Sequence, residues 1–241
     1  MLISIDLLLD IATCVALMHT RSFGGASVTI PHKLDIIPHL SSLSAAAATI
    51  GAVNTIHSIN GKLVGDNTDW KGIARPVAAR LESSASPIGR SNKVALVVGA
   101  GGTAMAACYA MQQLGLRLVV FNRTLDKAID VAQRFGGTAV ASLTDLDAVD
   151  VVVGTIPAAA GFVLPEHLLS KHVIVMDAAY KPAITPLLAQ AHAHGAVCIQ
   201  GYEMLVEQGL EQSKLWTHEA VAKEVLASQV KATLAASDVL H

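Results

Sequence analysis

Two short polar stretches near the start of the chain carry residue types suited to chemistry on an alcohol or a ketone. Ser27–Lys33 (SVTIPHK) is typical of a strand that runs into a proline turn and ends on a lysine. Gly65–Trp70 (GDNTDW) is a turn-rich segment that contains Asp69. An ammonium can polarise a carbonyl oxygen and transfer a proton, while a carboxylate holds the lysine in place. Taken separately, each stretch is also typical of an ordinary turn with solvated ends.

A third stretch has the pattern of a dinucleotide site. Gly99, Gly101 and Ala104 match G-x-G-x-x-A, after an expected strand and at the start of an expected helix. The first glycine permits a tight turn, the second lets a pyrophosphate approach the backbone, and the alanine permits close packing of helix on strand. The helix start then presents free amides to the phosphates. The alternative is a strand-to-helix turn that binds nothing.

The next expected strand indicates which dinucleotide would bind. It ends on Asn122, Arg123 and Thr124, about 20 residues beyond the glycines, where NAD-binding proteins place an acid for the ribose 2′-hydroxyl. A guanidinium there can pair with a 2′-phosphate through two hydrogen bonds, whereas an acid would repel it. The pattern therefore favours NADP over NAD, with a solvated surface charge as the alternative for Arg123.

Strand and helix signals alternate around these residues, which predicts a doubly wound α/β unit with a parallel sheet. The expected strands are Lys93–Val98, Arg117–Asn122, Val149–Gly154, Val173–Asp177 and Ala196–Gln200, and the expected helices are Thr103–Leu114, Asp126–Phe135 and Thr185–His194.

The segment before this unit has its own pattern. We expect a strand at Ala26–Ile30, a helix over Pro38–Thr49 and a strand at Val53–Ile59. Met1–Met18 lacks the positive start of a signal peptide, so a buried amphipathic helix is favoured over a targeting segment. The Ser-rich stretch Leu81–Asn92 marks a boundary.

These signals give three predicted parts. They are a substrate domain over 1–80, a nucleotide domain over 81–203, and C-terminal helices over 204–241 that pack back on the substrate domain. After the last expected strand come two helical stretches, Tyr202–Leu215 and Glu219–Ala236.

Composition excludes several functional classes. Hydrophobic residues make up 52% and charged residues 15%, with a net charge of −2 and no basic run, so direct nucleic-acid binding is not expected. A membrane span is not expected either, because Asp6 and Asp10 interrupt the apolar N-terminal stretch. The Cys14, Cys108 and Cys198 spacing fits neither a metal site nor a disulfide framework, which indicates a reducing, cytoplasmic location. His192 and His194 lie two apart on an expected helix and face different ways, so no metal is predicted.

The motifs in their order resemble the shikimate dehydrogenase family. They are SVTIPHK, GAVNT, GDNTDW, GAGGTA, NRT, DAAYKPAITPLL and GYEMLVEQG, and they span roughly Phe23 to Leu215. Two stretches, Phe23–Thr29 (FGGASVT) and Gly101–Ala104 (GGTA), are similar in sequence to the version at the end of fungal pentafunctional AROM proteins and of related quinate-pathway repressors. The resemblance implies an α/β chain made of a Rossmann NADP-binding domain and a smaller, incomplete α/β catalytic domain.

The resemblance also implies roles for individual residues. Lys33 and Asp69 would be the catalytic pair for the NADP-dependent interconversion of 3-dehydroshikimate and shikimate in aromatic amino acid biosynthesis. Contacts with the substrate would come from Thr29, Asn54, Tyr180 and Gln208. Contacts with the cofactor would come from Gly99, Gly101, Gly102, Asn122, Arg123, Thr124, Gly201 and Met204.

Two departures from the family pattern qualify this expectation. The residues before Ser27 contain no Ser-x-Ser motif to hold the substrate carboxylate, so most of the first βαβ unit is expected to be missing and a sheet edge to be open. Met105 stands where the family usually has Arg, which either weakens phosphate binding or changes a packing contact.

Three hypotheses follow from this mixture of intact and missing motifs. The first is a shikimate dehydrogenase, or a fragment of a multifunctional aromatic-pathway protein, with weak or absent turnover. The second is a non-catalytic sensor of quinate or shikimate. The third is an incomplete chain that folds poorly, and quinate with NAD stays open as a variant of the first.

Overall fold

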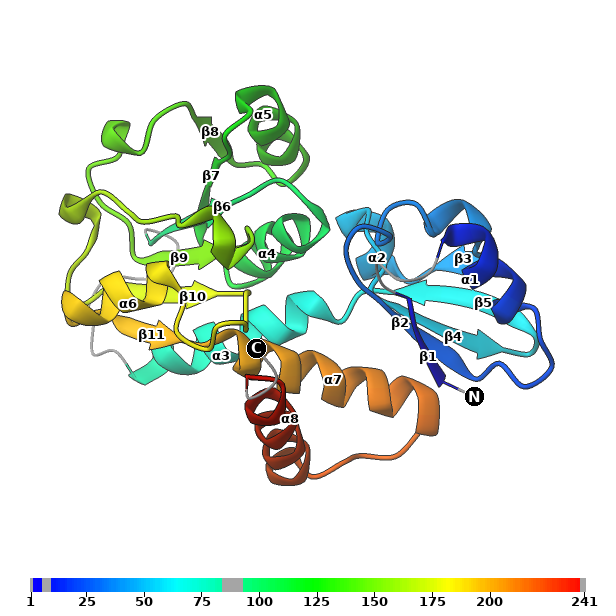
Figure 1. The fold of residues 1–241 in the computed structure, drawn as a ribbon. Helices are drawn as coiled ribbons and strands as arrows, with labels where there is room; N and C mark the ends of the chain where they lie inside the picture. The colour runs from blue at the N-terminus through cyan, green and yellow to red at the C-terminus, as the bar shows by residue number, and fades with distance from the viewer. Residues whose placement is uncertain (1, 6–9, 84–92, 239–241) are drawn as a thin grey trace.

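Two β-sheets, one in each half of the chain, organise the fold, as Figure 1 shows. The computed structural model describes residues 2–5, 10–83 and 93–238, with side chains over 10–83 and 93–234. The smaller sheet has five strands in the order β1-β2-β4-β5-β3, and the larger sheet has six in the order β11-β10-β9-β6-β7-β8. The predicted α/β class with a parallel nucleotide-type sheet is confirmed.

Every pair of neighbouring strands in the larger sheet is parallel. Its strands are β6 (Val94–Val98), β7 (Arg117–Phe121), β8 (Thr138–Val140), β9 (Val151–Gly154), β10 (Ile174–Asp177) and β11 (Val197–Ile199). Ala95 and Val97 of β6 face one hydrophobic core, whereas Leu96 and Val98 face a second core. Because the sheet is buried on both faces, its strands have the near-continuous apolar runs seen in the sequence.

Helices α4 (Gly102–Gln113), α5 (Leu125–Arg134) and α6 (Pro186–Ala193) connect these strands. The chain runs from β6 outward to β7 and β8, then returns to the other side of β6 as β9. Ligands of such sheets bind at the carboxyl ends of the strands where the order reverses. That position lies between β6 and β9, beside the glycine turn.

The smaller sheet is mixed. Its strands are β1 (Leu2–Ile5), β2 (Gly25–Val28), β3 (Ser42–Leu43), β4 (Thr55–Ile59) and β5 (Lys62–Asp66), with helices α1 (Ile11–Met18) and α2 (Ala45–Ile50). β4 is antiparallel to both β2 and β5. A separate core that includes Cys14, Ile36 and Ile56 lies against this sheet.

Two expectations for this segment are corrected. Met1–Met18 is not one helix, because Leu2–Ile5 pairs parallel with β2 and the helix begins after Asp10, whose carboxylate accepts a hydrogen bond from the Thr13 amide. β1 therefore covers the edge of β2 that was expected to be open. The expected helix over Pro38–Thr49 begins only after Ser44, whose hydroxyl caps it, because serine favours a cap over a helix interior.

A helix missed in the sequence, α3 (Asp69–Ser83), lies between the two sheets beside α7 (Gly201–Thr217), as Figure 1 shows. Ile73, Val77 and Leu81 are buried at a spacing of four residues, which is a helical signal interrupted in the sequence by Gly72 and Pro76. The predicted boundary at residue 80 falls inside this helix, and most of Leu81–Asn92 lies outside the described residues.

The two C-terminal helices pack differently. The indole Nε1 of Trp216 in α7 donates to the carbonyl of Ile56 at 2.9 Å, which fastens α7 to the smaller sheet. Helix α8 (Lys223–Asp238) packs on α7. The three domain boundaries themselves stay a prediction. No helix in the described part of the chain is long and apolar enough to cross a membrane.

Candidate active site

Lys33 and Asp69 form a buried ion pair at the junction of the two halves of the chain. Lys33 Nζ lies 2.5 Å from Asp69 Oδ2, and the two side chains are 11% and 5% exposed. Lys33 follows β2, and Asp69 is the first residue of α3. The sequence placed these two residues together on the resemblance alone, and the structure brings them into contact.

The short segment Ala52–Val53 is hydrogen-bonded to the chain on both sides of this pair. The Val53 amide donates to the carbonyl of Lys33 at 2.8 Å. The Asn67 side chain donates to the carbonyl of Ala52 at 2.9 Å and accepts from the Asp69 amide at 3.0 Å. Lys33 and Asp69 are therefore both held, through these hydrogen bonds, to one short segment between α2 and β4.

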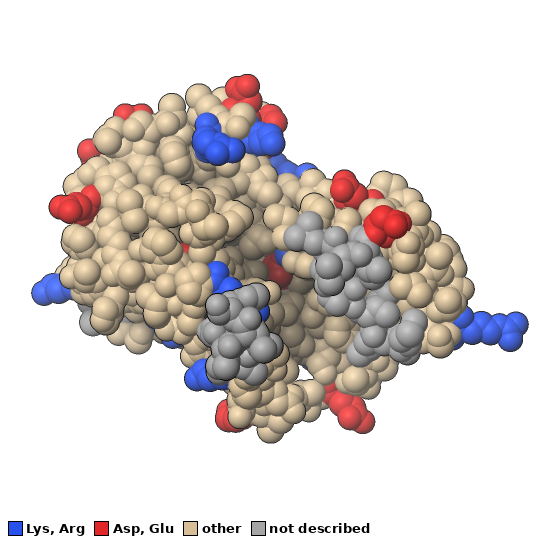
Figure 2. Space-filling view, viewed as in Figure 1, with Lys and Arg blue, Asp and Glu red and all other residues tan. Residues whose placement is uncertain are grey.

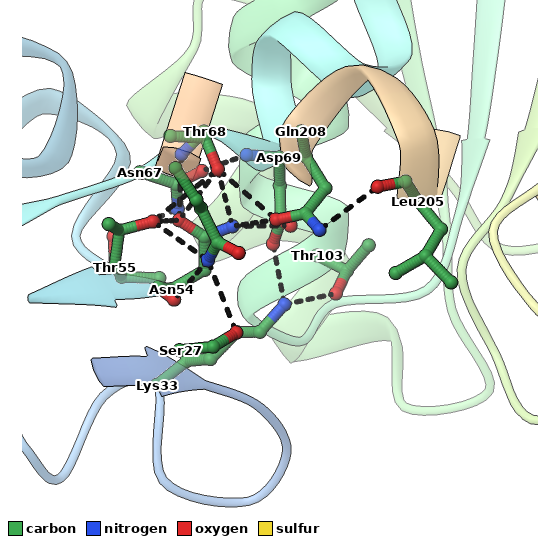
Figure 3. A network of polar contacts seen from close by, with 12 residues as sticks. Ser27, Lys33, Asn54, Thr55, Asn67, Thr68, Asp69, Thr103, Leu205 and Gln208 are labelled. Atoms are coloured by element: carbon green, nitrogen blue, oxygen red, sulfur yellow. Dashed lines mark hydrogen bonds and ion pairs between the residues drawn. The ribbon is translucent and has the colours of Figure 1, made fainter. Parts of the chain in front are cut away.

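Asn54 organises the polar network behind Asp69, which Figure 3 shows. Its Nδ2 donates to Asp69 Oδ1 at 2.8 Å, and its Oδ1 accepts from the Thr68 amide at 2.7 Å. Its Oδ1 also accepts from the Thr55 hydroxyl at 2.7 Å. Asn54 is 2% exposed, so both ends of its amide are engaged within the protein and it orients the carboxylate.

Two glutamines on α7 reach this network from the other side. Gln208 Oε1 lies 3.2 Å from Asn54 Nδ2, and its Nε2 donates to the Leu205 carbonyl at 3.1 Å. Gln212 Nε2 lies within hydrogen-bond distance of Ser27 Oγ, the Asn54 carbonyl and Thr55 Oγ1. Helix α7 thus ties β2 to β4 directly behind the Lys33–Asp69 pair.

The ion pair faces a cleft of about 610 Å³, and Figure 2 shows that this face of the molecule is hollowed between the two halves. All four residues predicted to contact the substrate line it, together with Gly201 and Met204. The lining also includes the predicted catalytic pair, and the full predicted set found there is Thr29, Lys33, Asn54, Asp69, Tyr180, Gly201, Met204 and Gln208. The assignment of each residue to substrate or cofactor stays a prediction.

The glycine turn has the shape that a dinucleotide requires. Gly99 has φ +124°, a conformation that side chains other than glycine rarely adopt, and an added Cβ would collide with Thr155. Gly101 caps α4 without a side chain, and a Cβ added to it would meet nothing within 4 Å. The space beside Gly101 at the start of α4 is therefore open, which fits a pyrophosphate at the helix start.

The residues after β7 lie beside this turn. Gly99 donates its amide to the Phe121 carbonyl at 2.8 Å, so Asn122, Arg123 and Thr124 follow directly from the neighbouring strand. Arg123 is exposed, and Asn122 Nδ2 donates to the Thr124 carbonyl at 2.9 Å. A cation at this edge fits the 2′-phosphate of NADP.

Asp177 and Thr185 hold the loop that carries Tyr180 into the cleft. The Thr185 hydroxyl donates to Asp177 Oδ2 at 2.6 Å, and the Ala179 amide donates to Asp177 Oδ1 at 3.1 Å. Burial raises the pKa of Asp177, and these two hydrogen bonds oppose the rise. Both ends of the loop are thereby fixed to the larger sheet.

Sequence reasoning missed several residues of the site, namely Thr55, Asn67, Thr68, Thr103 and Gln212. Asn67 and Thr68 stand inside a motif that had been recognised, so their proximity to Asp69 was an available signal. Gln212 gave no sequence signal, because a single polar residue in a helix forms no recognisable pattern. Met105 is 7% exposed and belongs to the core of the larger sheet, which supports the packing interpretation of this departure.

Comparisons with known proteins agree with this geometry. The family model "Shikimate dehydrogenase substrate binding domain" matches residues 6–56, and "Shikimate / quinate 5-dehydrogenase" matches residues 82–183. The shikimate dehydrogenase (NADP(+)) of Maridesulfovibrio salexigens is 36% identical, with 86% of this chain and 77% of that protein covered.

A larger relative and a solved structure extend the comparison. The pentafunctional AROM polypeptide of Schizosaccharomyces japonicus is 41% identical over 84% of this chain, and the chain spans 14% of that polypeptide's length. The shikimate 5-dehydrogenase of Thermus thermophilus, solved with NADP(H) and shikimate, superposes with a TM-score of 0.80 at 29% identity, covering 94% of this chain and 85% of that chain. The chain belongs to the shikimate dehydrogenase family.

Proposed function

We propose that this chain interconverts 3-dehydroshikimate and shikimate with NADP as the cofactor. The observation that carries the proposal is the buried Lys33–Asp69 pair, which faces a cleft that is also lined by Thr103, the residue that follows the glycine turn. The names of the family relatives, which include an NADP(+)-dependent shikimate dehydrogenase, support the choice of substrate and cofactor.

The residues of the cleft have distinct tasks in this proposal. Bound NADPH supplies the hydride for the ketone carbon. The Lys33 ammonium hydrogen-bonds the ketone oxygen and gives it a proton as the hydroxyl forms, and in the reverse direction the neutral amine takes that proton back. Asp69 holds Lys33 in place, and Asn54 fixes the carboxylate of Asp69.

The cofactor site is proposed from the fit of this chain's own groups. The amides at the start of α4 would hold the pyrophosphate beside Gly101, and Arg123 would pair with the 2′-phosphate. Gly201 and Met204 line the cleft on the side of α7 and would contact the nicotinamide.

The setting of the protein is part of the same proposal. The three cysteines are free thiols in the structure, which supports a reducing, cytoplasmic location. The match to one segment of AROM polypeptides supports an origin as one unit of a multifunctional aromatic-pathway protein.

Turnover is measured with purified protein, shikimate and NADP⁺, by following the absorbance of the reduced cofactor. Removing a positioned acid–base group costs about 10²–10⁴-fold in rate, so Lys33→Met should lose activity by that factor. The same assay tests the expected weakness of turnover and the preference for NADP over NAD. Absence of both turnover and NADP binding, together with binding of quinate or shikimate, would favour the sensor hypothesis instead.

A further inference from the structure

The ammonium of Lys33 has a second partner, which comes from the opposite side of the cleft. Lys33 Nζ donates to Thr103 Oγ1 at 3.2 Å, in addition to its contact with Asp69 (Figure 3). Lys33 belongs to the half that carries the smaller sheet, whereas Thr103 lies in the first turn of α4, directly after the glycine turn. This hydrogen bond therefore joins the catalytic lysine to the nucleotide-type half of the chain.

The backbone of this first turn also packs against the lysine. A Cβ added to Gly102 would lie 3.3 Å from both Lys33 Cβ and Ala52 Cβ. Such distances are shorter than those of ordinary packing, so glycine lets the start of α4 approach the lysine stem closely. The position of Thr103 relative to Lys33 is thus set by backbone contact.

A second contact holds the two halves together nearby. Arg134, at the end of α5, donates from Nε to the Thr49 carbonyl at 2.8 Å and from Nη2 to the Ala48 carbonyl at 3.1 Å. These carbonyls end α2, which shortly precedes the Ala52–Val53 segment that holds the Lys33 backbone. The approach of Thr103 to Lys33 is accordingly supported from two places.

The geometry of an ammonium explains what the threonine contributes. An ammonium has three N–H donors on a flexible stem. Asp69 and Thr103 accept two of them, and the third remains for an oxygen in the cleft that Lys33 lines. With one acceptor alone, the group rotates about a single hydrogen bond, and the direction of its free N–H is not fixed.

We propose that Thr103 is a positioning residue that aims the Lys33 ammonium at the substrate oxygen when the two halves are closed on each other. The inference rests on the proposed function, in which Lys33 is the proton donor. It assigns to the glycine turn a task besides holding phosphate, because the turn also delivers the hydroxyl that orients the lysine.

The kinetic test compares three variants. Thr103→Val has nearly the same shape and loses the acceptor, whereas Thr103→Ser keeps a hydroxyl. Thr233→Val is the control: it makes the same change on the exposed face of α8, where the Thr233 hydroxyl donates to the Gln229 carbonyl at 2.9 Å. Loss of one hydrogen bond to a charged group corresponds to a roughly tenfold lower rate if the bond is present in the transition state. We expect kcat of Thr103→Val to fall about tenfold, with KM for shikimate nearly unchanged, and Thr103→Ser to recover most of it.

A second measurement does not depend on turnover. The free protein is treated briefly with acetic anhydride, and acetylation of Lys33 relative to the exposed Lys62 is quantified by peptide mass spectrometry. We expect Lys33 to be labelled several-fold faster in Thr103→Val, but not in Thr103→Ser or Thr233→Val, because the ammonium is less firmly held.

The two measurements separate this inference from the proposed function. If the wild-type chain has no turnover, the proposed function fails and the labelling result alone decides whether Thr103 holds Lys33. Unchanged labelling in Thr103→Val overturns the inference in every case. So does an equal loss of kcat in Thr103→Val and Thr103→Ser, since that pattern reports altered packing of the helix start.

Discussion

Replacing Lys33 by methionine should destabilise the protein markedly, because it leaves a buried carboxylate without its cation. Methionine keeps the length of the stem and removes the ammonium. Asp69 is 4% exposed, and after the change its carboxylate retains Asn54 Nδ2 at 2.8 Å as a donor.

The size of the loss follows from these contacts. At 2.5 Å, two unit charges attract by roughly 6–7 kcal/mol at an effective dielectric constant of about 20, before desolvation is subtracted. Removing one partner of a buried pair costs about 3–5 kcal/mol. The remaining hydrogen bond from Asn54 partly compensates, so we expect about 3 kcal/mol, near the lower end of that range.

Lys71 offers a matched control. Its ammonium lies 2.5 Å from Glu211 Oε2, the same separation as in the Lys33–Asp69 pair, but the Lys71 side chain is 36% exposed. Exposed ion pairs contribute about 0–1 kcal/mol, so Lys71→Met should cost at most about 1 kcal/mol. The double variant Lys33→Met/Asp69→Asn removes both charges, and we expect it to recover most of the loss.

Urea unfolding at neutral pH measures the free energy of unfolding of each variant. Tryptophan fluorescence, from Trp70 and Trp216, and far-ultraviolet circular dichroism should give coincident transitions if unfolding is two-state. For Lys33→Met the midpoint should fall by about 1–2 M urea. The reasoning is refuted if Lys33→Met and Lys71→Met are equally stable, or if the double variant is less stable than Lys33→Met.

Three further predictions concern other parts of the site. Burial raises the pKa of Asp177, so the contribution of this group to stability is greatest below the ordinary carboxyl pKa and falls as the pH rises through the raised pKa. In thermal melts, Asp177→Asn should therefore gain stability relative to wild type between about pH 4 and pH 7, and a difference that stays constant with pH would contradict this. Arg134→Met removes two hydrogen bonds to α2 and should lower the free energy of unfolding by about 1 kcal/mol in urea titrations, whereas no change would show that the contact is weak in solution. Arg123→Ala should raise KM for NADP by roughly 10–100-fold and leave KM for NAD nearly unchanged, and an equal effect on both cofactors would remove Arg123 from the 2′-phosphate site.

The sequence by itself determined the features that obey local rules. The parallel sheet was readable because strands buried on both faces must be apolar throughout, as in β6 and β9. The glycine turn was readable because the backbone at Gly99 has φ +124°, which restricts the residue type at that position. The resemblance of the ordered motifs to one family then predicted Lys33 and Asp69 as the catalytic pair.

Local rules failed where side chains compete with the pattern. Helix α3 was missed because Gly72 and Pro76 interrupt its buried stripe, although Gly72 is needed there, since an added Cβ would meet the Met204 carbonyl at 2.8 Å. The start of α2 was misplaced because the side chain of Ser44 decides where the helix begins.

The resemblance paired Asp69 with Lys33, but only the tertiary structure decided which other polar groups surround the lysine and its carboxylate. Asp69 and Thr103 are separated from Lys33 by 36 and 70 positions in the chain. Gln212 is separated from Asn54, to which it hydrogen-bonds, by 158 positions. No period or composition links residues so far apart. The pairing of β2, β4 and β5 and the packing of α7 and α4 across the cleft bring them within hydrogen-bond distance, because those contacts are made by elements and not by neighbouring residues.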